Sequence, residues 1–143
     1  MELTDIIGYE FKNKKFLEDA LTRVAYAREN GISSDETMDY LAVLGDAVMD
    51  LIVIGKIIDD GVFDKGEITK MKIDSVNMSV FRSLAEKINL PEFVRWGKGE
   101  IRMQIWMSGR VSAECFEALM GAVYLDGGVD SAKAVFNRVS GEV

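Results

Sequence analysis

The 143-residue chain contains no histidine, a single cysteine (Cys115) and a single proline (Pro91). The lack of histidine excludes Ser-His-Asp and Cys-His catalysis, zinc sites with histidine ligands and imidazole-based pH switches. One cysteine forms neither an internal disulfide nor a cysteine-rich zinc site, and this favours a cytoplasmic protein. Chemistry in this chain must therefore come from carboxylates, lysine, arginine, hydroxyl groups or a hard metal ion bound through oxygen.

Long apolar runs are also missing. The longest apolar stretch, near Leu51–Gly55, is far shorter than the roughly 20 residues that a membrane-spanning helix needs. The N-terminus lacks the basic segment and apolar run of a signal peptide, so we expect no membrane partner. Apolar residues make up 48% and charged residues 29% of the chain, a balance typical of one globular domain, here residues 1–143.

Acidic residues outnumber basic ones, 24 to 17, and the net charge of −7 argues against a general nucleic-acid-binding surface. The charge is uneven along the chain, however. Residues 65–110 contain nine basic and five acidic side chains, so this segment is positive while the remainder is strongly acidic. One face of the protein is therefore expected to be locally basic.

Hydrophobic residues recur at three- and four-residue spacing along most of the chain, which predicts an all-α fold. The segment 37–59 is apolar on most sides, a pattern typical of a central helix. Turn-forming Asn, Asp, Gly and Pro residues separate the segments. We expect a helix or arm at 2–7, helices at 11–30, 37–59, 67–88, 111–125 and 130–139, a turn at 97–99 and a helix end at 126–128.

Two of the expected helices carry carboxylates on one side. At about 100° per residue, Asp39, Asp46 and Asp50 project within roughly 40° of one another. Glu114 and Glu117 lie three residues apart on another helix, and neither segment contains a basic residue between its acids. If the two sets faced each other, the like charges would raise one another's pKa or require an outside cation such as Mg²⁺. On spacing alone, two solvated helix faces are the more common outcome, and both interpretations stay open at this point.

Two sequence blocks are specific enough to indicate a family. Residues 41–48 read Leu-Ala-Val-Leu-Gly-Asp-Ala-Val and resemble the ribonuclease III signature, whose usual form is Glu-Arg-Leu-Glu-Phe-Leu-Gly-Asp-Ala-Val. Residues 117–128, Glu-Ala-Leu-Met-Gly-Ala-Val-Tyr-Leu-Asp-Gly-Gly, look like the second acidic motif of the same family. Shorter segments fit the family in order, so the resemblance covers nearly the whole chain; they are residues 8–13, 20–22, 65–72 and 97–100.

The resemblance implies an all-α endonuclease domain that acts as a homodimer. It also implies double-stranded RNA as the substrate, and Mg²⁺, with Mn²⁺ as a substitute, as the cofactor for phosphodiester hydrolysis. Asp46, Glu114 and Glu117 match the positions of metal ligands, although Glu114 has a longer arm than the aspartate of the family. Asp39 stands at the first glutamate of the signature and completes the expected catalytic set.

Four residues are expected to contact RNA. Glu67 falls where the family often has an acid near the RNA. Lys65, Lys70 and Lys72 are candidates for phosphate contacts, although ordinary solvated helix charges explain them equally well. The family's full-length members use a double-stranded-RNA-binding domain for affinity, and none follows residue 143. We therefore expect affinity to come from residues 65–110 or from a separate RNA-binding protein.

Three positions depart from the family pattern. Ala42 stands where the signature has a second metal-binding glutamate, Lys65 where an acid is common, and Arg23 where histidine is usual. A missing carboxylate weakens a Mg²⁺ site, because the charge and number of oxygen ligands set its affinity. The sequence is therefore compatible with an endoribonuclease that has an atypical site, or with a catalytically impaired domain that binds RNA or a protein. A third alternative, a plain helical dimerisation domain, predicts no acidic cluster in space and no metal. It would be favoured if Asp46 and Glu117 lay far apart.

Smaller features carry further expectations. Gly45 is interpreted as a position of close helix packing, and Cys115 as a buried, inert thiol. In the family, the helix with the first signature forms much of the dimer interface. Its apolar residues are candidates for partner contacts, with packing inside the chain as an equal alternative; they are Leu41, Val43, Leu44 and Val48.

Overall fold

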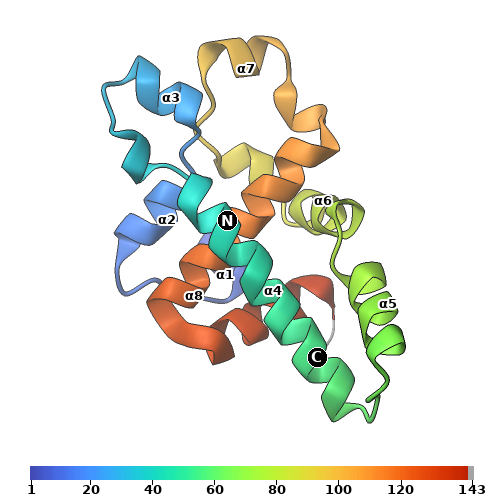
Figure 1. The fold of residues 1–143 in the computed structure, drawn as a ribbon. Coiled ribbons are helices and arrows are strands. Elements are labelled where there is room, and N and C mark those ends of the chain that lie inside the picture. Colours follow the sequence, from blue (N-terminus) through green and yellow to red (C-terminus); the bar gives the residue numbers. More distant parts are fainter. Residues whose placement is uncertain (142–143) are drawn as a thin grey trace.

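The structure, a computed structural model, describes residues 1–141 and is helical throughout, as expected (Figure 1). Within these residues the one extended pairing is an isolated bridge between Thr22 and Arg95. No helix in the described part of the chain is long and apolar enough to span a membrane. The helices are α1 (Leu3–Ile7), α2 (Lys14–Ala20), α3 (Val24–Glu29), α4 (Asp39–Asp59), α5 (Lys65–Ser75), α6 (Met78–Lys87), α7 (Lys98–Arg102) and α8 (Gly109–Ser140), with short 3₁₀ turns η1 (Ser34–Glu36), η2 (Leu90–Phe93) and η3 (Ile105–Met107).

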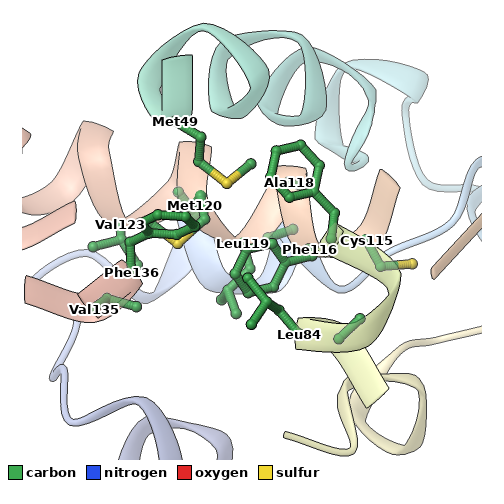
Figure 2. Packing of buried hydrophobic residues seen from close by; sticks show 14 of the residues in the cluster. Met49, Leu84, Cys115, Phe116, Ala118, Leu119, Met120, Val123, Val135 and Phe136 are labelled. Atoms are coloured by element: carbon green, nitrogen blue, oxygen red, sulfur yellow. The ribbon is translucent and has the colours of Figure 1, made fainter. Parts of the chain in front are cut away.

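The core is built around α8, which α4, α6 and α2 contact from different sides (Figure 1). Phe116, Leu119 and Met120 of α8 are fully buried. Figure 2 shows Met49 reaching from α4 and Leu84 from α6 toward this row of side chains. Burial of large apolar side chains contributes roughly 1.5–3 kcal/mol each, so α8 is the element on which the fold depends most.

The helices α4 and α8 cross at two glycines. A Cβ on Gly45 would lie 1.7 Å from the carbonyl oxygen of Glu117, and one on Gly121 would lie 2.1 Å from that of Leu41. The two backbones therefore approach as closely as they do only because both positions lack a side chain. The expectation of close packing at Gly45 is confirmed, and this crossing sets the separation of the residues next to it, Asp46 and Glu117.

The apolar pattern of residues 37–59 predicted a central helix, and α4 packs on several helices but leaves one apolar side exposed. One side of α4 packs on α8, but Val43 and Leu51 on the opposite side are 77% and 58% exposed. Of the candidates for partner contacts, Leu41 and Val48 are buried inside the chain, whereas Val43 is exposed and Leu44 half-buried. Periodicity shows which sides of a helix are apolar. It does not show how many of those sides other elements of the chain cover.

Three boundaries differ from the expected ones because backbone N–H groups bond to partners other than those of the expected elements. The helix expected at 11–30 breaks at 21–23, where the N–H of Arg23 donates to the carbonyl of Arg95 at 3.2 Å. The helix expected at 67–88 breaks at Asn77, whose side chain accepts the N–H of Val80 at 2.9 Å and caps α6. The turn expected at 97–99 is the start of α7, because Glu100 accepts the N–H of Gly97 at 3.1 Å.

The segment Asp126–Gly128, expected to end a helix, instead marks a kink within α8. Gly128 adopts a positive φ of 83°, and the chain continues in helical form through the expected last helix. The carboxylate of Asp126 accepts hydrogen bonds from the Tyr9 hydroxyl at 2.6 Å and from the N–H groups of Lys12 and Asn13 at 2.8 Å. These bonds tie the segment before α2 to α8.

Candidate active site

Carboxylates from two helices meet beside the crossing of α4 and α8. Asp46 and Glu117 are joined by a hydrogen bond between their side chains. With Glu114, they line the walls of two cavities of about 550 and 330 Å³. Asp39 and Ala42 line the larger cavity, and Asn77 and Arg110 line the smaller one. The large separation of Asp46 and Glu117 that would favour a plain dimerisation domain is therefore not found.

The carboxyl group of Glu117 holds its proton to a higher pH than an ordinary glutamate does. Burial of Glu117, with repulsion from Asp46 and the hydrogen bond to it, raises the pKa of Glu117 to about 7 from an ordinary value of 4.5. The nearby acids Glu114 and Asp50 act in the same direction. Two carboxylates in contact tolerate both negative charges only when a cation replaces the proton, so this pair is the most cation-demanding point of the site.

The ends of the carboxylate set do have cations, contrary to the expectation from the local sequence. Arg23 Nη1 lies 3.7 Å from Glu114 Oε1, and Lys72 Nζ lies 3.6 Å from Asp50 Oδ2. Both cations come from elements other than α4 and α8, which is why the sequence around the acids did not reveal them. In the described residues, neither Asp46 nor Glu117 forms an ion pair.

The donor chemistry fits a hard divalent ion, because the three candidate ligands that line both cavities, Asp46, Glu114 and Glu117, all offer carboxylate oxygens. Within residues 1–141, no set of three or more acidic or cysteine side chains is already arranged to hold one metal ion. Asp46 and Glu117 are in direct contact, whereas Glu114 contacts Arg23. The ligand set Asp46, Glu114 and Glu117 shares both cavities and stays a prediction.

Asp39 and Asp50 have different places despite sharing a helix side. Asp39 is exposed in the first turn of α4 and lines the larger cavity with Ala42 and Val43. Asp50 lines neither of the two cavities and pairs with Lys72. Ala42 contributes a methyl group to the cavity wall where the family signature has a carboxylate.

The residues expected to contact RNA lie on α5, away from both cavities. Lys65, Glu67 and Lys70 are exposed on this helix, which packs against α4 and buries no side chain (Figure 1). Lys72 is half-buried, because its ammonium group approaches Asp50. The structure therefore separates the four residues into three on an open surface and one in an ion pair.

Sequence reasoning did not assign a role at the site to Arg23, Arg110 or Asn77. Arg110 lies four residues, about one helical turn, before Glu114, so its position on the same side of α8 was available from spacing. Arg23 was noted only as a departure from the family pattern and Asn77 not at all, because both reach the site from segments distant in the sequence.

Known proteins resemble this chain along almost its whole length. Residues 13–140 match the family model described as Ribonuclease-III-like. Ribonuclease 3 of Bdellovibrio bacteriovorus is 36% identical over 139 residues, which cover 95% of this chain and 58% of the relative. Ribonuclease 3 of Listeria monocytogenes is 33% identical over 144 residues, covering 96% and 61%. The chain thus spans about three fifths of the length of these curated relatives.

Solved structures agree with the fold. The nuclease domain of ribonuclease III from Campylobacter jejuni superimposes with a TM-score of 0.86 at 28% identity, covering 96% of this chain and 92% of that one. That structure is described as flexible in a region involved in dimer formation. A second structure of the same nuclease domain gives a TM-score of 0.80.

Proposed function

The chain belongs to the ribonuclease-III-like family, and we propose that it is a divalent-metal-dependent endoribonuclease that hydrolyses phosphodiester bonds in double-stranded RNA. The observation that carries this proposal is the contact between Asp46 and Glu117 in the wall between two cavities. Backbone packing holds these two carboxylates together, and the pKa of Glu117 is raised to about 7, so a divalent cation bound here would relieve their repulsion.

The residues have distinct tasks in this proposal. Asp46, Glu114 and Glu117 hold the ion, which is Mg²⁺ or, as a substitute, Mn²⁺. When bound, such an ion lowers the pKa of water and stabilises the charge that develops on the leaving oxygen. Asp39, exposed at the edge of the larger cavity, accepts a hydrogen bond from water and orients it toward the phosphate.

RNA is proposed to lie along α5, where Lys65 and Lys70 present exposed ammonium groups to phosphates and Glu67 lies beside them. Lys72 contributes less, because Asp50 already compensates part of its charge. With a net charge of −7 on the chain, binding is weak and falls steeply with salt. A separate RNA-binding protein in the cytoplasm is therefore proposed to add affinity.

A second copy of the chain is proposed to cover the exposed side of α4. This side, here called the α4 stripe, consists of apolar residues that follow one another at helical spacing. Val43 belongs both to the stripe and to the wall of the larger cavity, so the partner would lie next to the carboxylates. Each copy carries one site, and two sites would cut the two strands. The α4 stripe comprises Tyr40, Val43, Ala47, Leu51, Ile54 and Ile58.

A second candidate function is a domain that binds RNA or a protein without cutting. The observation that favours it is Ala42, which leaves one wall of the larger cavity without an oxygen ligand. Asp39 lies about one helical turn before Ala42, at the edge of the cavity. Its side chain is shorter than that of glutamate, so it replaces the missing oxygen ligand only in part.

Cleavage of long duplex RNA tests both functions. The protein is assayed with Mg²⁺ and with Mn²⁺ beside Ala42→Glu, Asp46→Asn and the control Asp59→Asn, which changes an exposed acid at the end of the same helix. We expect cleavage by the unchanged protein, at least a hundredfold loss in Asp46→Asn, faster cleavage in Ala42→Glu and no change in Asp59→Asn. If only Ala42→Glu cuts, the binding function is correct; if no version cuts with either metal, the nuclease proposal is wrong.

A further inference from the structure

Arg23 is a mostly buried cation that joins two acidic side chains from different parts of the chain. Its Nε and Nη2 donate to Glu100 Oε2 at 3.0 and 2.9 Å, and its Nη1 lies 3.7 Å from Glu114 Oε1. The side chains of Arg23 and Glu100 are only 15% and 12% exposed. The guanidinium therefore connects α7 to the carboxylate of α8 that lines both cavities.

The surroundings hold Arg23 in place from several directions. Its backbone is fixed by the pairing with Arg95, and its guanidinium lies 5.6 Å from the centre of the Trp96 ring. Its Nη1 also approaches the sulfur of Met38 at 3.6 Å. Glu100 is fixed in turn, because its second oxygen accepts the N–H of Gly97. These contacts hold the Arg23 guanidinium in one place. It therefore offers Glu114 a fixed point of attraction.

We propose that Arg23 is a positioning residue, whose guanidinium, anchored on Glu100, holds the Glu114 carboxylate in the wall between the two cavities. The inference rests on the proposed function, since it concerns how the site receives a divalent ion. One oxygen of Glu114 contacts Arg23, and the other oxygen has no hydrogen bond or ion pair in the described residues. Groups that orient a metal ligand in this way typically contribute 10–100-fold to metal affinity.

The positive charge of Arg23 and its role in holding Glu114 have opposite effects on metal affinity, and this makes the inference testable. A positive charge beside a cation site opposes metal binding, so removing it would tighten binding if Arg23 acted through charge alone. Removing a group that holds Glu114 in place would weaken binding instead. Lysine at this position retains the charge but loses the planar fork, and therefore separates the two effects.

The experiment measures Mn²⁺ affinity of the purified full chain by titration followed by electron paramagnetic resonance, without RNA. The variants are Arg23→Met, Arg23→Lys, Glu100→Gln and Asp46→Asn. The matched control is Arg95→Met, because Arg95 lies in the same backbone pairing and bonds Thr22 and the carbonyl of Glu18, but contacts no site carboxylate. Thermal melts establish that each variant is folded, and Glu100→Gln tests the inference if Arg23→Met does not fold.

We expect Mn²⁺ binding at least 10-fold weaker in Arg23→Met and in Arg23→Lys, a smaller loss in Glu100→Gln and a change within 2-fold in Arg95→Met. Equal or tighter binding in Arg23→Met, or full retention in Arg23→Lys, would overturn the inference while Asp46→Asn still reports on the proposed function. If the unchanged protein binds no Mn²⁺, or if Asp46→Asn binds it equally well, the proposed function fails and the inference fails with it.

Discussion

The substitution Gly45→Ala tests whether the site depends on the absence of a side chain where α4 crosses α8. The added Cβ would lie 1.7 Å from the carbonyl oxygen of Glu117 and 2.6 Å from its carbonyl carbon. Ordinary contact begins near 3.4 Å, so the helices must separate by about 1.7 Å at this point. The obstructing atoms belong to backbone, and no change of rotamer relieves the clash.

The magnitude follows from that geometry. Overpacking a core costs typically 1–3 kcal/mol when side chains can shift, and here they cannot, so we expect a loss of about 3 kcal/mol or more. Alanine is a better helix former than glycine by about 1 kcal/mol, which is too small to compensate. A loss of this size is a large part of the roughly 5–15 kcal/mol by which domains are stable.

The matched control is Gly55→Ala on the same helix, because a Cβ there meets nothing within 4 Å. It retains the gain in helix propensity, so it should be about 1 kcal/mol more stable than the unchanged protein. Urea denaturation followed by circular dichroism gives the free energy of unfolding of all three proteins at one protein concentration. The packing argument is refuted if Gly45→Ala is as stable as Gly55→Ala.

Two further predictions concern the carboxylate pair and the α4 stripe. Glu117 binds its proton more tightly in the folded chain, so without divalent ions the folded state takes up more protons than the unfolded one between pH 4.5 and about 7. The free energy of unfolding should therefore fall as the pH rises through this range, and the fall should be smaller in Glu117→Gln. Urea denaturation at several pH values measures both proteins. The same pH dependence in both would contradict the raised pKa of Glu117. Leu51→Glu places a charge on the α4 stripe and should convert a dimer to a monomer in sedimentation velocity, whereas Leu125→Glu, at a 42% exposed position on α8, should not. A chain that sediments as a monomer without either change would count against the dimer.

Arg23 and Lys72 compensate part of the negative charge at the two ends of the carboxylate set. They pair with Glu114 and Asp50 at the ends of the carboxylate set, and Asp46 and Glu117 lie between these pairs without an ion-pair partner in the described residues. The demand for an outside cation is therefore concentrated on one pair of side chains. A cation bound beside this pair would relieve the repulsion between the two carboxylates, even though Ala42 contributes no oxygen ligand.

Periodicity and motifs alone predicted the helical class, the two acidic helix sides and close packing at Gly45. These features are local: periodicity shows which side of a helix is apolar, and a motif such as Leu-Gly-Asp carries its glycine and acid together. Asp46, Glu114, Glu117 and Asp39 were therefore brought to common cavities as the spacing and the family resemblance predicted.

The tertiary structure alone decided which partners these groups meet. The pairing of Arg23 with Glu114 joins residues far apart in the sequence, and the break at 21–23 depends on a hydrogen bond to Arg95. The exposed side of α4 reads as core, because apolar spacing is the same whether a helix packs on its own chain or faces outward. Local sequence records what each side chain can do, whereas long-range packing sets what it contacts, and the chemistry of this site depends on those contacts.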